Sequence, residues 1–136
     1  MKTKKRAAKP KSRRSKMPRL FPIDDEMKEL AAMLEKEISD WPGVTKKPMF
    51  GFQGLYRNGV IFAALPRSRA IHSPRSLIFK FASMSSANMD AAKQDSRIDA
   101  ISRMPGSGWH SFEVRSASDL RDALDWLGRA YKAAKN

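Results

Sequence analysis

The chain has 136 residues, which is long enough for one hydrophobic core and too short for two domains of ordinary size. It contains no cysteine, so disulfides and thiolate-bound zinc are excluded and a cytoplasmic protein is the simplest expectation. The formal net charge is +13, no apolar run approaches the roughly 18 residues of a membrane-spanning helix, and no apolar segment of a secretory signal follows the basic start.

Residues 1–20 form a basic arm that is predicted to be disordered, ahead of one domain over residues 21–136. The arm carries ten basic side chains and no acidic one: Lys2, Lys4, Lys5, Arg6, Lys9, Lys11, Arg13, Arg14, Lys16 and Arg19. The rest of the chain holds the other 17 of the 27 basic side chains and all 14 acidic ones, a balance of only +3. Repulsion between like charges and the shortage of apolar side chains oppose folding of the arm. One interpretation of the arm is binding to nucleic-acid phosphates without base specificity, and the other is a solvated, solubilising tail.

A helix is predicted over residues 25–39, because apolar side chains recur there at steps of three and four. These side chains are Met27, Leu30, Ala31, Leu34 and Ile38. Asp24 is the expected N-cap, and Pro42 followed by Gly43 ends the helical pattern.

Residues 45–65 are predicted to form strands joined by turns, since aromatic and β-branched residues alternate with glycines. Asn58–Gly59 favours a type I′ turn, so residues 53–57 should pair with residues 60–65 as a hairpin. Residues 66–74 form a basic loop, and Leu77, Phe79 and Phe81 then alternate along a strand over residues 76–81.

The last third of the chain is predicted to hold two more helical segments and one strand. Residues 84–103 favour a helix or two short turns, residues 105–108 a turn, and Phe112 and Val114 a final strand. A helix over residues 117–134 follows, with Ser116 and Asp119 at the spacing of a capping box. The predicted fold is α+β, an antiparallel sheet with the N-terminal and C-terminal helices packed on one face.

Few side chains are candidates for catalysis or for binding a metal ion. His72 and His110 are the only histidines, and neither has a carboxylate or a second histidine at a ligand-like spacing. We therefore expect no metal, no cofactor and no catalytic residue. The candidates for contact with an anion or a ligand are Arg67, Arg69, Arg75, His72, Trp109 and His110.

Aromatic residues on the predicted strands have two interpretations. They are Phe50, Phe52, Tyr56, Phe79 and Phe81. They would stack on unpaired bases if they faced solvent, and they would form the core if they faced the two helices. The face of the sheet without helices is in turn a candidate surface for a protein partner.

Two segments resemble known families. Residues 48–65 resemble the N-terminal domain of the TfoX family in a Met-Phe-Gly turn, a Gly-Leu-Tyr sequence and the hairpin, and the closing Leu-Gly-Arg-Ala-Tyr-Lys-Ala-Ala also fits. Residues 105–115 resemble a family of small domains labelled "luciferase domain", a label that implies no demonstrated light-emitting chemistry. The positions that carry these resemblances are Met49, Phe50, Gly51, Gly54, Tyr56, Gly59, Trp109 and Tyr131.

The resemblances imply a compact α+β fold like that of YjbR-type proteins, and the TfoX resemblance implies a regulatory role exerted through a partner. They supply no catalytic residues, and the basic loop over residues 66–75 departs from the TfoX pattern as an insertion. The sequence therefore predicts a non-enzymatic binding or regulatory module whose arm has nonspecific affinity for nucleic acid. The alternative is a small-molecule-binding or enzymatic domain with a cleft near His72, Trp109 and His110.

Overall fold

The computed structural model describes residues 20–71, 73–81, 86–101 and 108–134. All but the last residue of the basic arm, and most of the turn predicted at residues 105–108, lie outside this part of the chain. Among the described residues, no helix combines the length and the apolar character needed to cross a membrane. The elements follow in the order β1 (Phe21–Pro22), α2 (Asp25–Ser39), β2 (Val44–Met49), β3 (Phe52–Arg57), β4 (Val60–Pro66), β5 (Arg69–Ala70), β6 (Ser76–Lys80), α3 (Ser86–Gln94), β7 (Ile98–Ala100), β8 (Trp109–Glu113), a 3-10 turn (Ala117–Asp119) and α4 (Leu120–Ala133).

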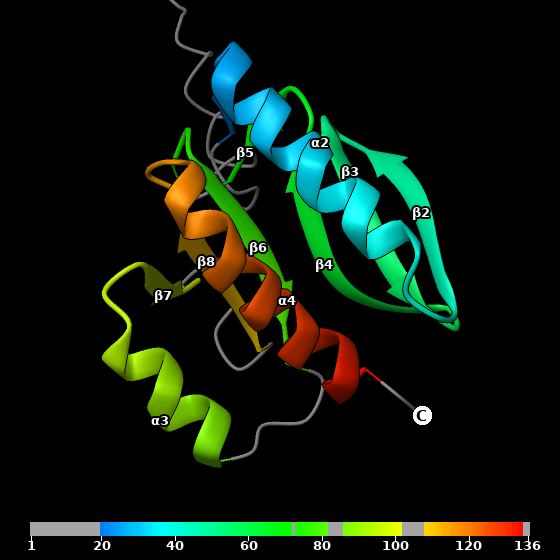
Figure 1. Ribbon diagram of the computed structural model, residues 1–136, viewed down its shortest axis with the longest axis vertical. Helices are drawn as coiled ribbons and strands as arrows, with labels where there is room; N and C mark the ends of the chain where they lie inside the picture. Colours follow the sequence, from blue (N-terminus) through cyan, green and yellow to red (C-terminus); the bar gives the residue numbers. More distant parts are fainter. Residues whose placement is uncertain (1–19, 72, 82–85, 102–107, 135–136) are drawn as a thin grey trace, which may run out of the picture.

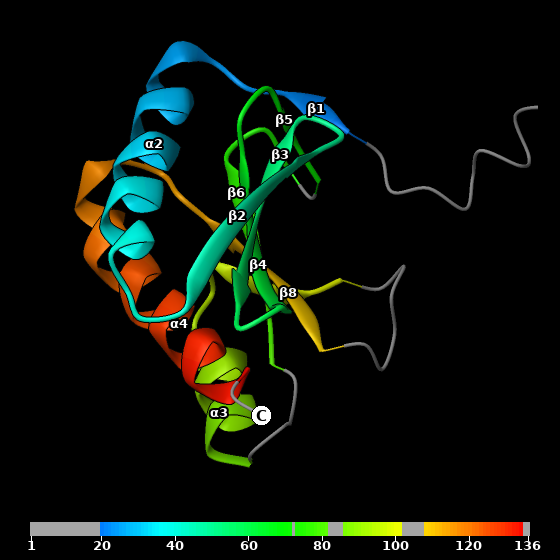
Figure 2. The same cartoon turned by 90° about the vertical axis from the view of Figure 1, so that its right-hand side faces the viewer.

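The architecture is a layer of helices on an antiparallel sheet. Six strands pair in the order β2-β3-β4-β6-β8-β7, and β1 pairs with β5 in a separate two-stranded sheet. Helices α2 and α4 lie side by side on one face of the large sheet, and α3 lies beyond the end that carries β7 (Figures 1 and 2). The predicted α+β class, with the N-terminal and C-terminal helices on one face, is confirmed.

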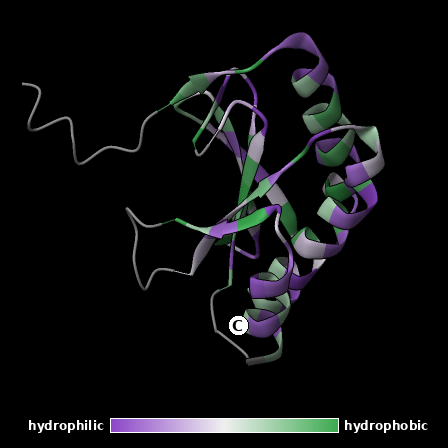
Figure 3. Ribbon diagram, turned by 90° about the vertical axis from the view of Figure 1, so that its left-hand side faces the viewer, coloured by the Kyte–Doolittle hydropathy of each residue, from purple (hydrophilic) through white to green (hydrophobic). Residues whose placement is uncertain are grey.

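Helix α2 begins and ends where the sequence predicts. The Asp24 side chain caps it, because Oδ1 accepts a hydrogen bond from the Met27 N–H at 2.8 Å. The side chains that set the helical pattern are all buried against the sheet: Met27, Leu30, Ala31, Leu34 and Ile38. Along both long helices, hydrophobic and hydrophilic stretches alternate (Figure 3), as expected of helices with one buried face.

The main core fills the space between the helices and the sheet. Its largest fully buried side chains include Phe62, Phe79 and Phe112 from the strands and Leu127 from α4. A second, smaller apolar cluster is formed by Phe52, Ala64, Ile78 and Ile101, with Met49, Ile71 and Trp109 packed against it. Because side chains alternate along a strand, Phe52 points away from Leu55 and the main core. The second cluster therefore belongs to the other face of the sheet.

The Asn58–Gly59 hairpin is confirmed. The φ angles of Asn58 and Gly59 are 49° and 86°, the two positive values of a type I′ turn. Residues of β3 and β4 pair from Arg57↔Val60 to Phe52↔Pro66, with a register shift between Leu55 and Tyr56.

Three local features differ from the sequence prediction. Within residues 84–103, α3 is a helix, but residues 98–100 form strand β7, which pairs with β8. The basic loop contains the short strand β5, which pairs with β1. The Ser116 hydroxyl bonds to the Ser118 hydroxyl at 2.8 Å and caps no N–H group, whereas Asp119 Oδ2 accepts from the Arg115 N–H at 2.8 Å.

Candidate functional site

One end of the domain brings together the basic loop, the β2–β3 turn and the strand that follows the arm. The carbonyl oxygen of Gly51 in this turn accepts the backbone N–H groups of Arg67, Ser68 and Arg69 at 2.9, 3.0 and 3.3 Å. Strand β5, which begins at Arg69, pairs with β1, the strand that begins directly after the arm (Figure 2). The arm therefore joins the domain beside the basic loop.

Two of the three candidate arginines in this region have no acidic partner among the described residues. Arg67 Nη1 donates to the side-chain oxygen of Gln53 at 3.4 Å, and Arg69 Nη1 donates to the carbonyl of Ser68 at 3.3 Å. Both arginines are exposed, and neither pairs with a carboxylate in the part of the chain that the structure describes. Their positive charge is therefore available to an anion.

Arg75 has a different environment. Its Nη1 lies 3.5 Å from an Asp24 carboxylate oxygen and 3.1 Å from one of Glu26, and its Nε donates to the Val114 carbonyl at 2.8 Å. These bonds tie the start of α2 to the chain just after β8. Two carboxylates offset the charge of this guanidinium, so Arg75 is a weaker candidate for anion contact than Arg67 or Arg69.

The structure separates the aromatic residues of the strands by exposure. Phe52, Phe79 and Phe81 are buried, so their faces are closed to a ligand. Tyr56 is partly buried, and the Lys47 ammonium lies 5.6 Å from its ring centre. Phe50 is different, because 77% of it is exposed.

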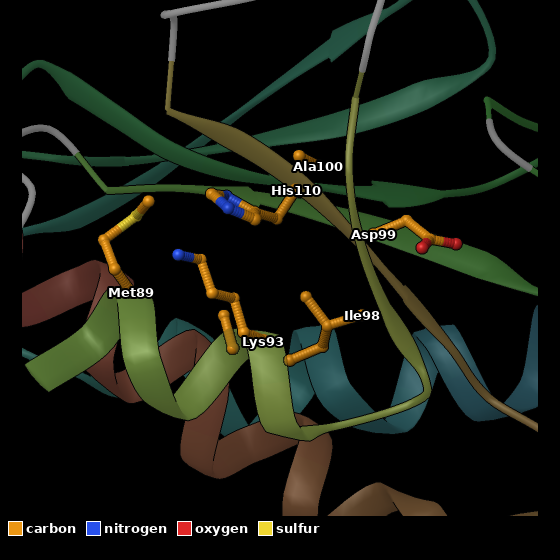
Figure 4. A pocket seen from close by; sticks show the side chains of 7 residues that line it. Met89, Lys93, Ile98, Asp99, Ala100 and His110 are labelled. Atoms are coloured by element: carbon orange, nitrogen blue, oxygen red, sulfur yellow. The ribbon is translucent and has the colours of Figure 1, made fainter.

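A cavity of about 150 Å³ lies between α3, β7 and β8. Its lining residues are Met89, Ala92, Lys93, Ile98, Asp99, Ala100 and His110. In Figure 4 the side chains of Met89 and Lys93 point from α3 toward His110, whereas Asp99 points away. The cavity therefore places one cation and one imidazole on a mostly apolar wall.

The imidazole of His110 is held in one tautomer when it is neutral. Its Nδ1 lies 2.9 Å from the Gly108 carbonyl oxygen, and a carbonyl only accepts, so Nδ1 carries the proton. The ring stacks on Phe79 at 5.8 Å between centres, and the residue is 7% exposed. The lone pair of the neutral ring is therefore on Nε2, the arrangement that orients a histidine toward a ligand.

The three residues of the predicted cleft are not all brought together. Trp109 and His110 are neighbours on β8, so their side chains point to opposite faces of the sheet. Trp109 packs against the second apolar cluster, and His110 contacts the aromatic side chains of the main core. His72 lies outside the described residues. Only His110 of the three lines the cavity described here.

Sequence reasoning missed a charged cluster centred on Arg97. Its guanidinium lies 2.8 Å from an Asp95 carboxylate oxygen, 2.9 Å from one of Asp119 and 3.0 Å from one of Asp122. The hydrogen bond from Arg97 lowers the pKa of Asp95, although burial acts in the opposite direction. Asp119 and Asp122 stand at the start of a predicted helix, where carboxylates usually face solvent, and the turn before β7 that brings Arg97 to them was not predicted. The pairing of one guanidinium with carboxylates from two parts of the chain indicates a structural tie.

Among the described residues, no three or more His, Asp or Glu side chains are placed to hold a metal ion together. Comparison with known proteins gives no match, whether to a family model, to a curated protein or to a solved structure. The resemblances to the TfoX and luciferase-domain families therefore stay predictions.

Proposed function

We propose that the chain is a non-enzymatic binding or regulatory module, TfoX-like in type, whose basic arm gives it nonspecific affinity for nucleic acid. The observation that carries this proposal is the uneven charge: ten basic and no acidic side chains in residues 1–20, against a near balance elsewhere. The exposed Arg67 and Arg69 lie beside β1, the strand that follows the arm in the chain, and add positive charge to this end of the domain. The TfoX-like part rests on the motif residues alone, and a cytoplasmic location rests on the absence of cysteine.

The expected mechanism is release of counterions from the phosphate backbone. Each lysine or arginine that neutralises a phosphate frees part of the condensed cation layer, so affinity falls as salt rises. An arm with all ten charges engaged would give a slope of about −9 in a plot of log affinity against log salt on duplex DNA. Such contacts read no bases, so random duplexes should bind alike.

A full-length variant with every arm lysine and arginine replaced by glutamine tests this role. It keeps the length of the chain and removes only the charge, so we expect duplex affinity to fall by several orders of magnitude at low salt and the slope to approach zero. Fluorescence anisotropy with a random duplex, measured over a salt series, gives both quantities. Lys36→Gln with Arg121→Gln, on the two helices, is the control and should bind as the unchanged chain does. Salt-insensitive duplex binding by the arm variant would refute the proposal.

A second candidate function is binding of a small molecule in the cavity beside His110, as the luciferase-domain alternative implies. Two observations favour it. The hydrogen bond from His110 Nδ1–H to the Gly108 carbonyl leaves Nε2 to accept a hydrogen bond, and the Lys93 side chain points toward the ring (Figure 4). A cavity of about 150 Å³ admits a ligand of only a few heavy atoms. A small hydroxy acid suits it, with the carboxylate on Lys93 and the hydroxyl donating to Nε2.

Glycolate is a suitable probe, with acetate, which lacks the hydroxyl, for comparison. We expect glycolate to raise the melting temperature in a concentration-dependent way, and His110→Gln and Lys93→Met to abolish that rise relative to each variant's own ligand-free value. Differential scanning fluorimetry measures the shift. An equal rise with acetate, or an unchanged rise in both variants, would remove this candidate.

A further inference from the structure

Two turns of the same type occur in this domain with different residues at the first central position. At Asn58–Gly59 the φ angles are 49° and 86°, and at Phe50–Gly51 they are 48° and 87°. Asparagine tolerates the left-handed region because its short polar side chain bonds locally, whereas a bulky residue there is an outlier. The β2–β3 turn thus has phenylalanine at the position where the β3–β4 turn has asparagine, the residue that this geometry favours.

The fold gains little from this phenylalanine. Phe50 is 77% exposed, more than Leu20 at 38% or Met33 at 58%, the other large apolar side chains exposed in the described part of the chain. Met33 lies on α2, where the backbone is unstrained and a long side chain is an ordinary surface residue. Phe50 combines a positive φ angle, which is unfavourable for a bulky residue, with an aromatic ring that is exposed to solvent. A residue that is strained and exposed, and that gains no packing in return, marks a functional position.

The backbone of this turn is held in a defined place. Three N–H groups of the basic loop converge on the Gly51 carbonyl, which fixes the backbone directly after Phe50. A Cβ on Gly51 would lie 2.8 Å from Arg69 Cγ and 3.0 Å from the Ser68 hydroxyl, so the stem of Arg69 lies against the turn itself. The exposed Phe50 and the stem of Arg69, whose guanidinium has no carboxylate partner among the described residues, therefore lie at the same turn.

The charge around this turn is positive. Arg67 and Arg69 have no carboxylate partner among the described residues. Glu35 lines a cavity of about 220 Å³ together with Arg67, but its Oε2 already accepts from Lys46 Nζ at 3.1 Å and from Gln53 Nε2 at 3.3 Å. The carboxylate that lines this cavity beside Arg67 is thus already bonded to Lys46 and Gln53, and Asp24 and Glu26 pair with Arg75, so the charges of Arg67 and Arg69 stay available to an anion beside the ring.

We propose that Phe50, with Arg67 and Arg69, is a stacking site for an unpaired base of single-stranded nucleic acid. The ring stacks on the flat face of the base, and the two guanidiniums bind the phosphates on either side. A duplex offers no free base face, so Phe50 acts only on single strands. This inference rests on the proposed function, because the arm supplies most of the affinity for either form.

Phe50→Asn tests the site in the full chain, because it makes this turn the same as Asn58–Gly59. Relief of the strain should raise the melting temperature by about 2–5 °C, which shows that the variant folds. Affinity for a short oligo-deoxythymidylate should fall by roughly 5- to 100-fold, while affinity for a duplex of the same length stays unchanged. Phe50→Trp should bind the single strand at least as tightly as the unchanged chain, and Met33→Ala should bind it equally. Fluorescence anisotropy at one fixed salt concentration compares all four chains.

The outcomes separate this inference from the proposed function. If Phe50→Asn binds the single strand as the unchanged chain does, the stacking site is wrong, and loss of binding in the arm variant still supports the proposed function. An equal fall for single strand and duplex would also overturn it, since stacking acts on free bases alone. The inference is also overturned if Phe50→Asn loses binding to anionic phosphatidylserine vesicles while its affinity for the single strand is unchanged, because the ring would then serve a lipid surface. If instead the arm variant keeps duplex binding, the proposed function fails by itself.

Discussion

Gly108 occupies a position that no other residue type suits. Its φ is +85°, and a Cβ there would lie 2.5 Å from the Phe81 carbonyl oxygen. Its own carbonyl accepts the Phe81 N–H at 3.1 Å and the His110 Nδ1–H at 2.9 Å. The close approach of two backbones and the orientation of the cavity histidine therefore depend on one glycine.

Gly108→Ala is expected to destabilise the fold more than a positive φ alone explains. Gly59 is the matched control, because its φ is +86° and a Cβ there would meet nothing within 4 Å. Gly59→Ala should lower the free energy of unfolding by about 1 kcal/mol from backbone strain, and Gly108→Ala by about 3 kcal/mol or more, because the Phe81 backbone must also move. Urea denaturation measures both values. Equal losses would show that the contact with Phe81 relaxes without cost.

At this scale the sequence predicts some turns and not others. Asn58–Gly59 is recognisable because both residue types favour positive φ. The turn at Phe50–Gly51 has no such signal in its first residue: Gly51 marks a turn between strands but not its type, and the Met-Phe-Gly resemblance points to the same position. The exposure of Phe50 depends on the loop at residues 67–69 packing against Gly51 and leaving the ring free, which no local pattern reveals.

At the scale of elements, Arg97 joins the turn before β7 to the start of α4. It stacks over the Phe112 ring at 4.8 Å, and Asp95 also accepts from Trp126 Nε1 at 3.3 Å. In Asp119 burial would raise the pKa, but the N–H of Arg115 and the guanidinium of Arg97 outweigh it, so the pKa is lowered. The two carboxylates, each with a side chain 15% exposed, stay ionised to a lower pH than an ordinary aspartate does.

This cluster gives the stability a defined dependence on pH. A carboxylate whose pKa is lower in the folded chain stabilises the fold above its ordinary pKa of 3.8 and loses that contribution as the pH falls through the folded value. Arg97→Met should lower the free energy of unfolding at neutral pH by about 1.5–3 kcal/mol and flatten its decline below about pH 4. Urea denaturation over a pH series measures both, with Arg121→Met, an exposed residue of α4, as the control. An unchanged acid decline in Arg97→Met would contradict the assignment.

Long elements are more predictable than short ones in this chain. Helices α2 and α4 each repeat an apolar pattern over several turns, and their predicted limits agree with the structure to within three residues. Strand β7 has three residues, Ile98–Ala100, too few to show alternation, and its pairing partner β8 lies beyond an intervening segment. The Arg97 cluster depends on that pairing, so it could not be predicted before β7 was known.

At the scale of the whole molecule, most of the excess positive charge lies outside the described domain. The described domain buries an apolar core between α2, α4 and the sheet, and most of the net charge of +13 belongs to residues 1–20. The sequence predicted this division, because charge and apolar periodicity are properties of composition. It did not predict that the basic loop packs beside the β2–β3 turn and the strand after the arm, because that juxtaposition depends on pairing between distant residues.

The order of the sheet also has a consequence for how the chain folds and for what it exposes on the way. Strands β2, β3 and β4 are joined by two-residue turns and can pair early, whereas the β6–β8 pairing joins residues as distant as Ser76 and Glu113. Until β6 docks, β4 is an unprotected edge, and it contains the most apolar run of the sequence, Val-Ile-Phe-Ala-Ala-Leu. Aggregation during synthesis or refolding is therefore expected to start from β4, and the ten like charges of the arm oppose it by keeping partly folded chains apart.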